Sequence, residues 1–119
     1  MFTQERVDEI VAEARQAAAD AATKYFNEKL GGVDQYACGF AWLEVYRYDG
    51  KRISGATRLG KMLKAAGMSK QDYGDKAWQI WNPSRLGCQN VDAKEAGARA
   101  AAQVFVSHGF EAYAASRLD

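Results

Sequence analysis

The stretch YACGFAWLEVYRY, Tyr36 to Tyr48, alternates between two kinds of side chain and predicts a β-strand. One face of this strand is small and aliphatic: Ala37, Gly39, Ala41, Leu43 and Val45. The opposite face is mostly aromatic: Tyr36, Cys38, Phe40, Trp42, Glu44, Tyr46 and Tyr48. We expect helices to pack closely on the small face, whereas the aromatic face needs a cover or a ligand.

The residues that follow this strand predict the other elements. Asp49-Gly50 is a strong hairpin-turn signal, so residues 51–54 are expected to pair back briefly. Apolar spacing predicts helices over 55–66 and 92–108, and apolar runs predict strands over 76–81 and 110–117. Asp92 and Glu95 have the spacing of a capping box at the start of the later helix.

The longest helix is predicted over residues 3–30, with Thr3 as its N-cap and Gly31-Gly32 after its end. At a rise of about 1.5 Å per residue it is about 40 Å long, which exceeds the core of one small domain. Its apolar stripe is rich in alanine, so the helix crosses the domain, extends beyond it or pairs with a second copy. From this excess length we predict a homodimer.

Together these elements predict a single domain over residues 1–119, with a long helix over 1–31 and a core over 34–119. The expected fold class is α+β, with α/β as the alternative: a small sheet of three to four strands with helices mainly on one face. Because helices alternate with strands, some strand pairs are expected to be parallel through crossover connections.

The net charge of +1 gives no overall field that would select DNA or a membrane. Residues 35–90 nevertheless carry nine basic and four acidic side chains, so an anionic partner is expected to meet the middle of the chain. The first residues lack the pattern of a signal peptide, and no run approaches the ~20 apolar residues of a membrane helix. We therefore expect an intracellular, soluble protein with reduced cysteines, no metal and no cofactor.

A family of small, uncharacterised proteins from tailed-phage and prophage genomes resembles this chain in five phrases: ACGFAWLEV, TRLGKMLKAAG, QIWNPS, CQNVDAKEAGARAAAQVF and the ending AYAASRLD. The resemblance covers roughly residues 34–119. It implies a viral accessory protein in the cytoplasm of a bacterial host, and it supplies no catalytic residues. Accessory proteins of this kind often act by binding: they block a host enzyme, sequester a defence signal or coat nucleic acid.

Catalysis has little support in the sequence. The single histidine, His108, falls in the last turn of helix 92–108, where the helix dipole favours a cation. Neither cysteine has a base nearby in sequence, and we expect Cys38 to lie in the sheet as a small hydrophobe and Cys88 to be the exposed thiol. Because proximity of a thiol to His108 stays open, a small hydrolase or thiol enzyme is the third hypothesis.

The start of helix 55–66 is a candidate phosphate site, because a helix N-terminus offers free N–H groups. It carries Ser54, Thr57, Arg58 and Lys61, with no acidic residue, although it is not a P-loop. The alternative is ordinary N-capping by Ser54 or Thr57 beside a solvated basic face.

The aromatic face of strand 36–48 is the second candidate. Trp42 and Tyr46, joined by Tyr113 and Arg117 from the last strand, would form a surface on which bases stack. The alternative is that the first helix or a second subunit covers these side chains.

The third candidate is the loop after strand 76–81, within QIWNPSRLGCQNVDAKE. Pro83 is expected to hold Asn82 extended. If the strands run parallel, this loop opens on the same edge as the start of helix 55–66, so that Arg85 and Arg58 together grip an anion. The remaining ligand contacts would come from Trp81, Gln89 and Asn90. The alternative is a long polar connector.

These candidates give the leading hypothesis, a non-catalytic accessory protein that binds a nucleotide-like or nucleic-acid anion through the basic, aromatic middle of the chain. The alternative is a protein that inhibits a host defence protein by surface complementarity. Binding to nucleic acid should weaken with salt, because it releases counterions from the phosphates.

Overall fold

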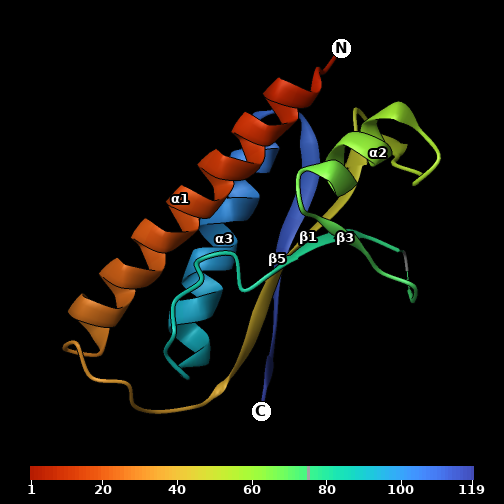
Figure 1. Cartoon of the computed structure of the whole chain (residues 1–119). Helices are drawn as coiled ribbons and strands as arrows, with labels where there is room; N and C mark the ends of the chain where they lie inside the picture. The colour runs from red at the N-terminus through yellow and green to blue at the C-terminus, as the bar shows by residue number, and fades with distance from the viewer. Residues whose placement is uncertain (75) are drawn as a thin grey trace.

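A computed structural model of the protein describes residues 1–74 and 76–119. Its elements follow the order α1 (Gln4–Lys29), β1 (Gly39–Tyr48), β2 (Lys51–Arg52), α2 (Arg58–Ala65), β3 (Ser69–Lys70), β4 (Trp78–Trp81), α3 (Val91–Ser107) and β5 (Phe110–Leu118). One five-stranded sheet carries the helices on one face, which confirms the predicted α+β class (Figure 1). Among the described residues, none of the helices has the length and apolar character needed to cross a membrane.

β1 is the central strand of the sheet. β5 pairs with it from Gly39↔Leu118 to Tyr48↔Phe110, with a shift of register between Val45 and Arg47. β2 and β4 pair with segments of β1 that β5 also contacts, so they must share the opposite edge of β1. β3 then pairs with the outer side of β4.

Every strand pair is antiparallel, so the predicted parallel pairs are wrong. A crossover connection does exist, because α3 joins β4 to β5 and both of these strands run opposite to β1. The reason for the wrong prediction is that β1 lies between them, and each therefore meets an antiparallel neighbour.

Local signals place most element ends close to their predicted positions. The hairpin turn at Asp49-Gly50 is confirmed, with positive φ at both residues, and Thr3 caps α1 by accepting a hydrogen bond from Arg6 N. The predicted capping box is wrong, because the Asn90 side chain caps α3 by accepting from Ala93 N at 2.8 Å. β3 was not predicted; it is two polar residues long and has no apolar alternation.

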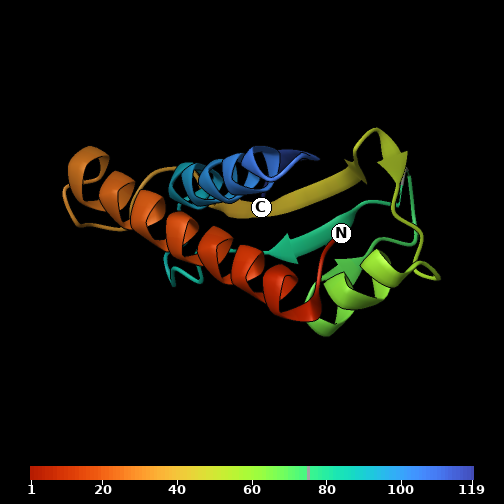
Figure 2. The ribbon, with the colours of Figure 1, turned by 90° about the horizontal axis from the view of Figure 1, so that it is seen from above.

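The alanine stripe of α1 packs against α3 within the same chain. Ala14, Ala18 and Ala22 of this stripe are fully buried within the chain. Gly97 of α3 allows this approach, since a Cβ there would lie 3.0 Å from the Ala18 carbonyl oxygen. Figure 2 shows the two helices side by side. The homodimer therefore stays a prediction, but the alanine stripe no longer supports it.

Both long helices cover the aliphatic face of β1, as its alternation predicts. The main core joins Val7 and Ile10 of α1 to Leu43 and Val45 of β1 and to Phe105 of α3. The alternative in which the first helix covers the aromatic face is consequently wrong. α3 and β1 come close together at Gly39, where a Cβ would lie 2.8 Å from Val91 Cβ of α3 and 2.5 Å from the Arg117 carbonyl oxygen of β5.

We predict that Gly39→Ala lowers the free energy of unfolding by about 1–3 kcal/mol, because the added methyl group overpacks a site bounded by backbone. Urea denaturation followed by circular dichroism measures this change. Gly87→Ala is the matched control, because a Cβ at Gly87 meets nothing within 4 Å. Equal stability of the two variants would contradict the close contact at Gly39.

Candidate functional site

The candidate site is the face of the sheet turned away from α1 and α3, called here the open face. Its side chains come from three adjacent strands: Phe40, Trp42, Glu44 and Tyr46 of β1, Gln79 and Trp81 of β4, and Tyr113 and Arg117 of β5. The large rings stay accessible, since Trp81 is 49% exposed and Tyr113 is 55% exposed. The tertiary structure therefore brings the four predicted stacking residues and Trp81 onto one surface.

A stacked pair of indoles forms one half of the open face. The rings of Trp42 and Trp81 lie opposite each other in register, with centroids 5.0 Å apart and an interplanar angle of 15°. Phe40 lies 5.7 Å from Trp81, and the guanidinium of Arg117 lies 5.5 Å from the Phe40 ring centroid. An exposed aromatic stack with a cation at its border is a surface on which a further planar group can stack.

A carboxylate lies at the centre of the open face. Glu44 accepts hydrogen bonds from Trp42 Nε1 at 3.0 Å, from the Tyr46 hydroxyl at 2.6 Å and from Gln71 Nε2 at 2.7 Å. Partial burial disfavours its ionised form, yet the hydrogen bonds from Tyr46, Gln71 and Trp42 outweigh it and lower the pKa of Glu44 below 4.5. Glu44 is therefore a charged anchor that fixes the orientation of two aromatic side chains.

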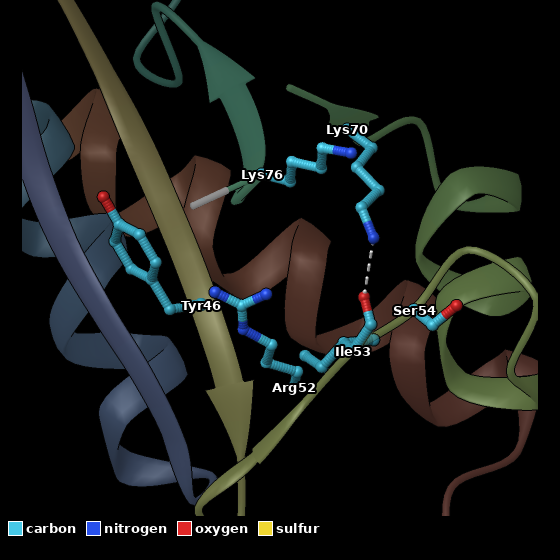
Figure 3. A pocket seen from close by; sticks show the side chains of 6 residues that line it. All are labelled: Tyr46, Arg52, Ile53, Ser54, Lys70 and Lys76. Carbon is cyan, nitrogen blue, oxygen red and sulfur yellow. Dashed lines mark hydrogen bonds between the residues drawn. The ribbon is translucent and has the colours of Figure 1, made fainter. Parts of the chain in front are cut away.

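A basic pocket of about 140 Å³ opens on the other side of Tyr46. It lies beside the edge of β1 with which β2 and β4 pair. Figure 3 shows the residues that line it: Tyr46, Arg52, Ile53, Ser54, Lys70 and Lys76. The Lys70 ammonium donates to the Ile53 carbonyl at 3.2 Å, and Trp78 Nε1 donates to the same oxygen at 2.8 Å. Three cationic side chains around a small pocket favour an anion.

The predicted phosphate site at the start of α2 has a structural role. Thr57 is the N-cap, with its hydroxyl accepting from Gly60 N at 3.0 Å and donating to the Ser54 carbonyl at 2.6 Å. Ser54 Oγ accepts from Ala56 N. The local turn thus occupies both hydroxyls, which matches the capping alternative. Arg58 and Lys61 are exposed on the surface of α2.

Arg58 and Arg85 do not meet, so the predicted two-arginine anion grip does not form. Arg58 lies beside Tyr48 at the end of β1, whereas Arg85 follows a turn that begins where Asn82 N donates to the Ala41 carbonyl near the start of β1. These two points are separated by about 20 Å along the strand. The grip required parallel strands with a common edge, and β4 runs antiparallel to β1.

The loop between β4 and α3 bonds mainly to itself and to neighbouring backbone. Asn82 has a φ of 43°, so the prediction that Pro83 holds it extended is wrong; a turn follows in which Arg85 N donates to the Asn82 carbonyl. Asn90 is 1% exposed, and its amide group both caps α3 and donates to the Gln35 carbonyl. Gln89 remains exposed, while its backbone N–H donates to Asp34. This arrangement matches the connector alternative.

The thiols and the histidine lie at opposite ends of α3. Cys38 forms a β-bridge with Asn90 just before α3, and Cys88 is two residues further back, whereas His108 follows the last residue of the helix. The 17 residues of α3 separate them by about 25 Å. His108 instead contacts Glu13 Oε1 at 3.0 Å. No cysteine–histidine pair for nucleophilic catalysis is therefore formed within the described part of the chain.

Residues 1–74 and 76–119 contain no group of three or more histidine, cysteine or acidic side chains placed to hold a metal ion. Sequence reasoning missed Lys70, Lys76 and Gln71 as parts of the site. Lys70 and Gln71 lie in or next to β3, which has no apolar pattern, and Lys76 lies two residues before β4.

We predict that Glu44→Gln lowers the free energy of unfolding at pH 7 by about 1 kcal/mol. The loss is smaller than for a fully buried hydrogen bond to a charged group, because solvent reaches Glu44. The folded pKa of Glu44 is depressed, so its stabilising contribution is present above pH 4.5 and is lost as the pH falls through the folded pKa. Urea denaturation at a series of pH values measures the difference between variant and wild type. A difference that does not shrink toward acidic pH would contradict this role.

We predict that the two cysteines react at different rates, in the reverse of the order predicted from the sequence. Cys38 is exposed, whereas Cys88 is buried, and burial raises the pKa of the Cys88 thiol. Alkylation at neutral pH, followed by mass spectrometry, should give one fast site in the folded protein, which Cys38→Ser removes. Fast labelling of Cys88 in that variant would contradict the packing at the start of α3.

Comparison with known protein families, curated proteins and solved structures finds no match to this chain.

Proposed function

We propose that the protein is a non-catalytic phage accessory protein that acts in the cytoplasm of a bacterial host by binding single-stranded nucleic acid on its open face. The observation that supports this proposal is the uncovered aromatic patch of Phe40, Trp42 and Trp81, bordered by Arg117. Stacking of one base on such a surface contributes about 1–3 kcal/mol and tolerates any base.

The basic pocket supports a role for the phosphate backbone. Lys70 and Lys76 line it together with Arg52, and Tyr46 of the open face is also part of the lining. In this proposal the bases lie over Trp42 and Trp81, and a phosphate group reaches the pocket. Each phosphate neutralised on a single strand contributes about 0.7 to the slope of log K against log salt.

The position of Glu44 limits the path of the strand. Its three hydrogen-bond donors are neutral side chains, so the carboxylate keeps its negative charge at the centre of the face. A phosphate passing over Glu44 is disfavoured, whereas the exocyclic amino groups of bases are suitable partners for a carboxylate. The backbone is therefore expected to follow the edges of the open face.

The proposed binding surface does not include most of the loop and helix-start residues that the sequence suggested. Asn90 and Thr57 use their side chains within the fold, and Arg58 and Arg85 lie at opposite ends of β1. Ser54 stays part of the proposed binding surface, because it lines the basic pocket.

Inhibition of a host defence protein is the second candidate function, and the Glu44 carboxylate favours it. A negative charge at the centre of an aromatic surface opposes a polyanion but suits a basic patch on a protein. Exposed tryptophan, tyrosine and arginine are also the side chains that most often anchor protein interfaces.

We predict that Trp81→Ala weakens binding of a short labelled oligothymidylate by about tenfold or more, because one stacking platform is lost. Trp81→Phe should retain most of the affinity, since it keeps an aromatic ring at that position. Fluorescence anisotropy titrations at several salt concentrations measure both the affinity and its salt dependence.

Arg99→Ala is the control for general loss of positive charge, because Arg99 is an exposed residue of α3, on the helix side of the sheet. Arg117→Ala, by contrast, should weaken binding. If the wild-type protein binds no oligonucleotide at low salt, nucleic-acid binding is rejected. Capture of a host protein that Trp81→Ala abolishes would then support the second candidate.

A further inference from the structure

β5 is an edge strand with a free outer side. Among residues 1–74 and 76–119, β5 pairs with β1 alone. In an antiparallel pair, alternate residues direct their backbone N–H and C=O groups to the neighbour, and the intervening residues direct theirs outward. β5 therefore presents a row of backbone donors and acceptors that can pair with a further strand.

The usual features that protect an edge strand are sparse here. β5 is nine residues long, FEAYAASRL, and has no proline and only two charged residues, Glu111 and Arg117. The helix layer does not bury its second half, since Ser116 and Leu118 on the helix-facing side are exposed, Leu118 by 69%. Such an edge is suited to sheet extension.

We infer that β5 pairs antiparallel with β5 of a second copy, about a twofold axis that passes through Ala114. This register places Glu111 opposite Arg117 of the second copy, and the symmetry repeats the pair with the roles exchanged. Opposite charges directly across two strands stabilise the pairing. Glu111 already accepts from Arg47 at 2.7 Å, so its carboxylate is held in place on the open face.

The helix-facing side of β5 fits the same register. Leu118 lies opposite Phe110 of the second copy, which covers the most exposed apolar side chain of the strand with a ring that belongs to the core. Moving the axis by one residue removes the match. With the axis at Tyr113, Glu111 lies opposite Ala115 of the second copy, and with the axis at Ala115 it lies opposite Asp119. The charge pattern of β5 therefore selects Ala114 as the centre.

The resulting dimer has one continuous sheet with both open faces on the same side. Tyr113 and Arg117 of each copy, which lie on the open face, would then be close to the junction. The inference does not depend on the proposed function, because it rests on the free edge and its charges, and it places the dimer interface on β5 instead of α1.

Charge-reversal variants measured by native mass spectrometry and sedimentation velocity test the interface. The wild-type protein is expected to form a dimer. Arg117→Glu alone places two acidic residues opposite each other at both sites, and Glu111→Arg alone places two basic residues there. Each variant is expected to dimerise at least about tenfold more weakly than wild type.

An equimolar mixture of the two variants gives the decisive result. One copy then carries only acidic residues at positions 111 and 117, and the other carries only basic ones, so a heterodimer is expected to form while each homodimer is weak. Lys24→Glu, a charge reversal on the exposed surface of α1, is expected to leave dimerisation unchanged. Circular dichroism confirms that each variant is folded.

A monomeric wild-type protein at every concentration tested would overturn the inference. So would a dimer that both charge reversals leave unchanged, or a mixture of variants that forms no heterodimer. Loss of oligonucleotide binding in a variant that still dimerises would bear on the proposed function alone.

Discussion

The contact between the small face of β1 and the first residues of α3 is the constraint on which the rest of the structure depends. Gly39 leaves no space for a side chain between Val91 and the backbone of β5. The alanine residues of α3 that face inward are almost completely buried, and Gly97 also allows α1 to approach closely. Three layers of backbone therefore pack with little side-chain volume between them.

This close packing determines where the large side chains go. A β-strand alternates its side chains, so a strand whose inward residues are Gly39, Ala41, Leu43 and Val45 directs Phe40, Trp42 and Tyr46 to the other face. Tyr48 is the exception: a register shift after Val45 turns it toward the core, where it contacts Phe110. Hydrogen bonds fix the orientation of two of those rings. Glu44 holds Trp42 and Tyr46 by hydrogen bonds, and Gln71 from the β3 side completes the set. The open face is thus an ordered surface, which lowers the entropy lost when a ligand binds.

The same arrangement explains which parts of the candidate site could be predicted. Alternation within β1 places Trp42 and Tyr46 on one face, and alternation within β5 does the same for Tyr113 and Arg117; only the pairing of the two strands joins them into one surface. The basic pocket does not follow from local sequence, because Lys70 belongs to a two-residue strand that is recognisable only once β4 is beside it. The prediction that Asn90 contacts a ligand is not supported for a related reason. Its amide suits a ligand contact, but whether it caps a helix depends on where the helix begins.

The sequence by itself determined the number of long helices, the two unlike faces of β1, the hairpin at Asp49-Gly50 and the α+β class, because each depends on interactions between residues close together in the chain. Only the tertiary structure decided that β1 lies between β4 and β5, which makes every pair antiparallel and separates Arg58 from Arg85. It also decided that Cys88 is buried and Cys38 exposed, and that the alanine stripe of α1 packs against α3. These outcomes depend on which distant surfaces fit together, and side-chain periodicity within one segment carries no information about its neighbour.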